Sequence, residues 1–175
     1  HKGNKVSNQD WQRSSYSYTR IMKMKKDHIH LSYKQEHTVD LETEAIFFAA
    51  FYHGNESDGN TLLDSVNTAQ GNLQQADSHA EIKEDVGDKG YHKNETLAKC
   101  LADELRTYIC EPDGPNRRWT DKPAEYEAAY RANRRRLQGD RNKRLQKLRS
   151  ERVERSFAHV CETGGARRTW LRGLE

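Results

Sequence analysis

The stretch Val86-Gly87-Asp88-Lys89-Gly90-Tyr91-His92 decides the fold that we expect for this chain. It predicts a short strand that ends at Asp88, and a helix-forming run over 94–105 follows at once. A carboxylate at the carboxyl end of a strand, where a helix begins, lies where open α/β folds place their ligands. An Asp at such a position can also do no more than cap the next helix. The stretch alone leaves both roles open for Asp88.

Upstream of this stretch, the sequence predicts a β-hairpin followed by a helix. Strands are expected over 29–40 and 45–53, with residues 41–44 as the turn between them. The second strand is continuously apolar, which is typical of a strand that is buried on both faces. A polar loop follows, and apolar side chains then recur at helical spacing over 61–73.

Downstream, the sequence predicts one more strand and two helices. The strand is expected over 106–110 and is followed by a turn-rich connection that contains three of the residues that favour turns, Pro112, Gly114 and Pro115. Helices are expected over 124–137 and 141–160, interrupted near Gly139. A hairpin, then a helix, a strand, a helix, a strand and further helices predict an α/β fold with a mixed sheet and flanking helices.

The composition indicates one folded domain with a thin core. The chain has 175 residues, of which 33% are hydrophobic and 33% are charged, so its apolar share is low for a globular domain. Residues 1–28 show no sustained period and are interpreted as a polar arm or linker, which leaves 29–175 as the domain. Three cysteines without a CxxC pair favour a reducing cytoplasm, and no apolar run approaches the length of a membrane span.

The charges are unevenly distributed along the chain. The whole chain carries +3, but residues 131–155 contain eleven Arg or Lys and only three acids, a local balance of +8. The remainder therefore carries −5. A cationic run of this kind favours a polyanion partner at one end of the chain, and it includes Arg134, Arg135 and Arg136.

Several segments resemble the catalytic region of the DDE-type transposases of bacterial insertion sequences. GDKGYHKNETL, which begins at Gly87, and VERSFAHV, which begins at Val153, resemble the two motifs that carry the second catalytic Asp and the catalytic Glu. KVSNQDWQ and RTYICEPDGPNRRWTDKPAEYEAAYRANRRRL extend the resemblance over nearly the whole chain. The resemblance implies a ribonuclease H-like fold, metal-dependent cleavage and transfer of DNA strands, and catalytic roles for Asp88 and Glu154.

The chemistry of that reaction explains why carboxylates would be needed at these positions. Two divalent metals about 4 Å apart can activate the attacking oxygen and stabilise the leaving oxygen of a phosphodiester. Mg²⁺ prefers hard oxygen ligands, and Mn²⁺ can take its place, so Asp88 and Glu154 are the expected ligands. Spacing alone favours a different role for Glu154, an ion pair with a neighbouring arginine such as Arg152 or Arg155. The resemblance to transposases favours metal binding by Glu154 instead.

The departures from the transposase pattern matter as much as the resemblance. In the group, the first catalytic Asp lies in the first strand, in a pattern like DATTLEAN, which would fall upstream of His1. Asp40, in HTVDLETE, is the available substitute, but the family pattern places it at the hairpin turn. The group's strand before Asp88 is apolar, whereas here it contains Lys83, Glu84 and Asp85, and charge inside a buried strand is costly.

The expected protein is therefore a catalytic domain that lacks its first strand and one of its three acids, with the C-terminal helix of the group also missing. The alternative is a catalytically inactive remnant that binds nucleic acid through its basic helices. The expected partners are DNA, both transposon ends and target, and a second copy of the chain in a homo-oligomer, in the bacterial cytoplasm at the nucleoid. Trp119, between Arg118 and a polar loop, could stack on a base. The other residues expected at DNA are Lys89, Tyr91, Arg134, Arg135, Arg136, Arg167 and Arg168.

Overall fold

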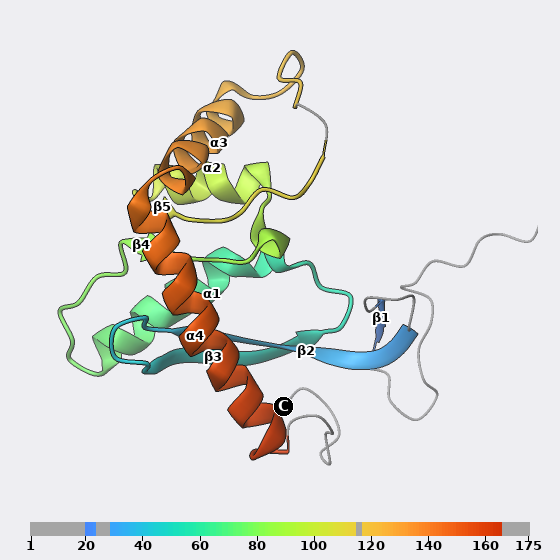
Figure 1. The fold of residues 1–175 in the computed structure, drawn as a ribbon, viewed down its shortest axis with the longest axis vertical. Helices are drawn as coiled ribbons and strands as arrows, with labels where there is room; N and C mark the ends of the chain where they lie inside the picture. Colours follow the sequence, from blue (N-terminus) through green and yellow to red (C-terminus); the bar gives the residue numbers. More distant parts are fainter. Residues whose placement is uncertain (1–19, 24–28, 115–116, 166–175) are drawn as a thin grey trace, which may run out of the picture.

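The computed structural model of the chain describes residues 20–23, 29–114 and 117–165, and it is a mixed α/β fold with small sheets (Figure 1). The arm predicted over 1–28 therefore lies mostly outside the described residues. The elements are, in chain order, β1 (Arg20–Lys23), β2 (Ile29–Val39), β3 (Ile46–His53), α1 (Asp58–Gln75), β4 (Glu84–Asp85), the 3₁₀ turn η2 (Lys89–Tyr91), α2 (Asn94–Ala102), β5 (Arg106–Thr107), α3 (Ala124–Leu137) and α4 (Asp140–Glu162).

The predicted hairpin is confirmed. Strands β2 and β3 pair antiparallel from Tyr33 opposite His53 to Val39 opposite Ile46. The turn between them is closed by Asp40, whose Oδ2 accepts hydrogen bonds from the backbone N and the Oγ1 of Thr43, at 3.0 and 2.6 Å. Such a local bond from an Asp side chain offers the backbone an alternative to the ladder and ends the strand.

The prediction that the second strand is buried on both faces is wrong. Helix α1 packs on one face of β3, but the side chains of Ile46 and Phe51 are 49% and 50% exposed. Strand β3 is also the last strand of its sheet, so within the described part of the chain it pairs only with β2. A continuous apolar run cannot distinguish a central strand from an edge strand, because tertiary packing decides which faces are covered.

The single mixed sheet that we expected is divided in two. One sheet has the order β1-β2-β3, and the other is the parallel pair β4-β5, in which Glu84 lies opposite Arg106. Each strand of the pair has two residues, so the strands predicted to end at Asp88 and at Cys110 are shorter than expected. No strand in the described ranges joins β2 to β4.

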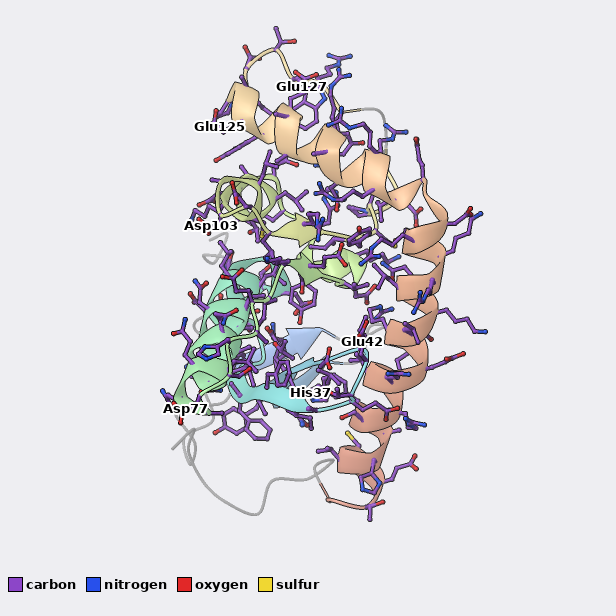
Figure 2. All side chains as sticks on the ribbon, turned by 90° about the vertical axis from the view of Figure 1, so that its left-hand side faces the viewer. His37, Glu42, Asp77, Asp103, Glu125 and Glu127 are labelled. Atoms are coloured by element: carbon purple, nitrogen blue, oxygen red, sulfur yellow. The ribbon has the colours of Figure 1, made fainter. Side chains whose placement is uncertain are left out.

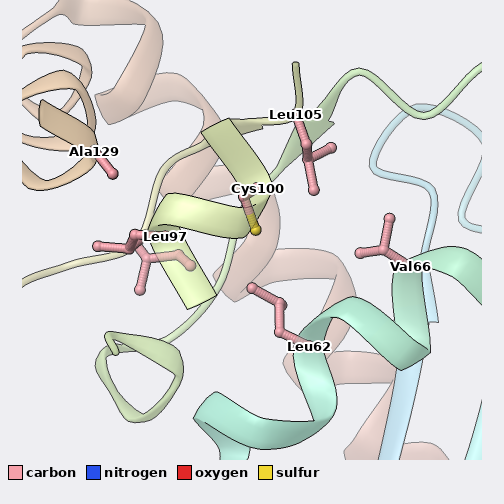
Figure 3. Close-up of a cluster of buried hydrophobic side chains, with 7 residues drawn as sticks. Leu62, Val66, Leu97, Cys100, Leu105 and Ala129 are labelled. Atoms are coloured by element: carbon pink, nitrogen blue, oxygen red, sulfur yellow. The ribbon is translucent and has the colours of Figure 1, made fainter. Parts of the chain in front are cut away.

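The helices bury a small core between α1, α2 and α3, as the composition predicted. Figure 3 shows that side chains from the three helices and from Leu105, just before β5, converge there. Helix α3 covers exactly the predicted span, and α4 begins after Gly139, where an interruption was predicted. The buried cluster consists of Leu62, Val66, Leu97, Cys100, Leu105, Ile109 and Ala129.

One buried polar side chain fixes α3 to the segment after β5. Asn133 has no exposed surface, and its Oδ1 accepts a hydrogen bond from the backbone N of Ile109 at 3.1 Å. Its Nδ2 donates to the carbonyl of the same residue at 2.8 Å. The side chain thus satisfies both backbone groups of Ile109, which a neighbouring strand would otherwise do.

Candidate active site

Asp88 lies in the loop after β4, at the start of η2. Its side chain is exposed, and Oδ1 accepts a hydrogen bond from the backbone N of Lys89 at 2.7 Å. This is the capping role that the sequence left open. Lys89 is exposed, and its Nζ lies 3.9 Å from the carboxylate of Asp113.

The loop that carries Asp88 is held to the body of the molecule by its neighbours. The hydroxyl of Tyr91 bonds to Glu36 of β2, and burial, followed by the nearby acids, raises the pKa of that tyrosine. A Cβ at Gly90 would meet Oδ2 of Asp58 at 2.2 Å, so a larger residue there would have to displace the Asp58 side chain. Tyr91 therefore anchors the loop, and its predicted contact with DNA stays a prediction.

Glu36 is the centre of a buried polar network that joins β2, α1 and η2. The residue is 4% exposed, and its carboxylate accepts hydrogen bonds from Ser65 Oγ and from Thr61 Oγ1, the latter at 2.6 Å. Lys34 Nζ lies 3.0 Å from Glu36 and 2.7 Å from Asp58. Burial acts to lower the pKa of Lys34, but its bonds to these two acids outweigh that effect and raise it.

Asp85, in β4, faces this network without a partner of its own. Its Oδ2 atom is buried and receives no hydrogen bond from the described residues, although the residue as a whole is partly exposed. Burial, followed by the negative charge of Glu36, raises the pKa of Asp85 to about 6. The sequence argument noted that charge in this strand is costly, and the raised pKa has the same physical origin.

Glu154 lies on α4 with its side chain 63% exposed, and Arg149 Nη2 is 3.8 Å from its carboxylate. An ion pair with an arginine is the role that spacing alone favoured. Asp88 thus bonds to the backbone of η2, whereas Glu154 pairs with an arginine of α4. In the described part of the chain, no three His, Cys, Asp or Glu residues are grouped so that they could hold a metal ion. The Mg²⁺ or Mn²⁺ site stays a prediction from the resemblance.

The residues around Glu154 attach α4 to the hairpin turn. Arg152 Nη1 donates to the carbonyls of Leu41 and Glu42, the latter at 2.7 Å, and Arg155 forms an ion pair with Glu44. Figure 2 shows α4 running along one side of the molecule, with Glu42 beside it. Two of the cations that the sequence assigned to a polyanion partner therefore bind this turn.

A ring contact supports the same attachment. His37 of β2 stacks on Phe157 of α4, with ring centroids 3.8 Å apart and an interplanar angle of 22°. His37 Nε2 is buried and receives no hydrogen bond from the described residues, and burial lowers the pKa of the ring. Asp40, the alternative ligand, bonds to Thr43 in the turn, and although burial acts to raise its pKa, these bonds lower it.

Trp119 belongs to an aromatic and cationic cluster that the loop before α3 forms with Tyr130 of α3 and with the start of α2. Its ring centroid lies 5.1 Å from that of Tyr130, and Lys122 lies over its ring at 5.3 Å. Arg117 lies 4.9 Å from the centroid of Tyr130 and donates to Asn94. The indole is half-buried in these contacts, whereas Arg118 next to it is exposed. Base stacking by Trp119 stays a prediction.

Most cations of the basic run have partners within the molecule. Arg136 Nε donates to the carbonyl of Thr107 at 2.9 Å, and Arg134 pairs with Glu111 at 3.6 Å. The side chains of Arg135 and Arg144 are exposed and make no hydrogen bond or ion pair with the described residues. Arg167 and Arg168 lie outside the described residues. The remaining cations of the run pair with acids: Arg131, Arg141, Lys143, Lys147, Arg149, Arg152 and Arg155.

The sequence argument missed the network around Glu36. A sequence signal for this network was present. Lys34 and Glu36 are two residues apart and share one face of a strand, and opposite charges on a face that a helix covers must pair there. Their partners on α1 lie 24 to 29 residues away, and no local pattern identifies them.

Comparison with known proteins adds no relative: no family model, curated protein or solved structure matches the chain. Among the described residues, no helix is long and apolar enough to cross a membrane.

Proposed function

We propose that the chain is an incomplete DDE-type transposase catalytic domain with a ribonuclease H-like fold that lacks its first strand. The observation that carries the proposal is the order of elements around the divided sheet. An antiparallel hairpin comes first, and α1 then leads to a parallel pair of strands with α2 between them. A strand between β2 and β4 would unite the two sheets into the mixed sheet that such a fold requires.

The proposal assigns Asp88 and Glu154 as the two remaining carboxylates of the site. Asp88 follows β4 and is exposed, which leaves its carboxylate open to a ligand from solvent. Glu154 would have to leave Arg149 before it could take the same role. Since two carboxylates fix a metal pair less completely than three, the chain is proposed to bind DNA without cutting it efficiently.

A nicking assay tests this part of the proposal. The purified chain, incubated with supercoiled plasmid and Mn²⁺, is expected to nick no faster than Asp88→Ala, because the third carboxylate is missing. Gel electrophoresis of the relaxed form measures the rate. Nicking that Asp88→Ala and Glu154→Ala abolish, while Glu151→Ala on the same helix does not, would show an active site. Asp40→Asn would then test the substitute ligand.

The second candidate function is binding of nucleic acid without catalysis. Arg135 at the end of α3 and Arg144 near the start of α4 favour it, because they are exposed cations whose charge no acid of the described chain neutralises. Phosphate contacts of this kind carry no sequence information, so the predicted binding is nonspecific.

The salt dependence of binding tests the second candidate. If about five cations contact phosphate, log K should fall with log salt at a slope of about −4 to −5. The double change Arg135→Ala with Arg144→Ala should flatten the slope by about 2 and leave the ranking of DNA sequences unchanged. Arg131→Ala is the matched control, since Arg131 already pairs with Glu127. Fluorescence anisotropy at several salt concentrations without Mg²⁺ gives the slopes, and an unchanged slope in the double variant would reject the role.

A further inference from the structure

The outer edge of β3 is an open strand edge. Strand β3 is last in the order β1-β2-β3, so this edge pairs with no strand in the described part of the chain. Helix α1 packs on one face of the strand (Figure 1). Residues 46–52 of β3 carry no charge and no proline, and the pairing with β2 is irregular only at the end beside Val39. Edge strands that stay unpaired usually carry charges or proline, because both oppose pairing with another chain.

The turn of the hairpin fixes which backbone groups of β2 point toward β3. The backbone N of Asp40 donates to the carbonyl of Ala45 at 2.9 Å, so the backbone of Asp40 faces β3. The backbone groups of successive residues point to opposite edges of a strand. Every second residue of β2 before Asp40 therefore faces β3 in the same way: Thr38, Glu36 and Lys34.

The same alternation leaves two residues of β3 with their backbone groups at the open edge. The residues opposite those three bond to β2, and they are Phe48, Ala50 and Tyr52. Between them, Ala49 and Phe51 direct their N–H and C=O groups away from β2. No group among the described residues bonds to these four backbone groups.

Both ends of this open stretch are closed from within the chain. At one end, Asn72 Nδ2 of α1 donates to the carbonyl of Phe47 at 2.7 Å. At the other end, the carbonyl of His53 accepts a hydrogen bond from the backbone N of Glu56 at 2.9 Å. The open donors and acceptors are thus confined to five residues, 48–52, and are arranged symmetrically about Ala50.

We infer that this edge binds the same edge of a second copy of the chain, antiparallel, around a two-fold axis at Ala50. A two-fold interface requires a surface that is complementary to itself. With Ala49 of each copy opposite Phe51 of the other, every open donor meets an open acceptor, which gives four ladder bonds. Moving the axis to Ala49 or to Phe51 would direct ladder bonds to the carbonyls of Phe47 or His53, which are already bonded.

The side chains beside this ladder are also complementary to themselves. Lys34 contacts α1, and Tyr52 lies opposite Lys34, so Phe51 lies on the face of β3 away from α1. Phe51 is 50% exposed, and in the pair each ring would lie across from the small side chain of Ala49. Residues 46–52 bring no like charges together. The inference rests on the hairpin alone and holds whether or not the chain is related to transposases.

Sedimentation velocity at increasing concentration tests the inference. Four ladder bonds bury little surface, so the full chain should change from monomer to dimer only between about 1 µM and 1 mM. Phe51→Lys should weaken the association by about tenfold or more, because a charge at a strand edge opposes pairing. Leu101→Lys is the control, since Leu101 is a 39% exposed apolar side chain on α2. A chain that stays monomeric throughout, or a dimer that both variants weaken equally, would overturn the inference.

Cross-linking tests the position of the axis. Ala50→Cys would place two thiols across the axis, in a non-hydrogen-bonded pair with Cα atoms about 4.5 Å apart, which a disulfide can span. Ala49→Cys is the matched control, because Ala49 faces Phe51 of the second copy. After mild oxidation, mass spectrometry of the linked peptides should find a bond between the two introduced thiols in Ala50→Cys alone. A dimer of Ala50→Cys that forms without this bond, or equal linking in the two variants, would overturn the inferred pairing.

Discussion

Replacing Asn133 with alanine is expected to lower the free energy of unfolding by about 3 kcal/mol, because two buried hydrogen bonds are lost and two backbone groups remain unsatisfied. Asn133 is fully buried, and both of its bonds go to the backbone of Ile109. That residue is also fully buried, so water cannot replace the lost amide. The change acts at the junction where α3 joins the core, and no other described side chain bonds the backbone of Ile109.

Urea unfolding followed by circular dichroism measures this effect. Asn72→Ala is the matched control, because its Nδ2 donates a single hydrogen bond, to the carbonyl of Phe47, from an exposed position. The control should cost less than about 1 kcal/mol. Asn133→Asp should be at least as damaging as Asn133→Ala, since a carboxylate would face the carbonyl of Ile109. Equal effects of Asn133→Ala and Asn72→Ala would show that the buried pair does not hold α3.

Elements set by local signals could be predicted from the sequence, whereas elements set by distant contacts could not. Helix α3 was predicted to its ends because helix-forming residues fill 124–137 and Pro123 precedes them. The break before α4 follows from Gly139. The exposure of Phe51 and the short length of β4 depend on which strands are available as neighbours, and no local pattern contains that information.

For the candidate site, the sequence could predict the position of its acid but not the partners of its cations. The motif identified Asp88 as an acid at a strand-to-helix junction, and the structure places it in the loop after β4. The composition identified a cationic run but not its partners. Arg141 pairs with Glu84, and Arg152 binds the carbonyl of Glu42; these partners lie 57 and 110 residues away in the sequence. A count of charges therefore overstates the cations available to DNA, because intramolecular pairing depends on the fold.

Replacing Asp85 with asparagine is expected to stabilise the protein at neutral pH. The folded state holds the pKa of Asp85 near 6, against an ordinary value of 3.8. Between these values the folded state binds more protons than the unfolded state, so the parent loses stability as pH rises from about 4 to about 6. The full shift corresponds to about 3 kcal/mol, and the unpaired amide that replaces the carboxylate would offset part of this gain. The gain of Asp85→Asn at pH 7.5 should therefore be between about 1 and 3 kcal/mol.

The comparison of two pH values isolates this effect from any other consequence of the amide. Urea unfolding at pH 4.0 and pH 7.5 gives the difference in free energy between parent and variant at each pH. At pH 4.0 Asp85 is protonated in the folded parent, so the variant should gain little stability from the loss of the carboxylate charge. At pH 7.5 the difference should favour the variant. Asp64→Asn, an exposed position on α1, is the control and should behave alike at both values. A difference that does not change with pH would show that the Asp85 carboxylate is not strained by its burial beside Glu36.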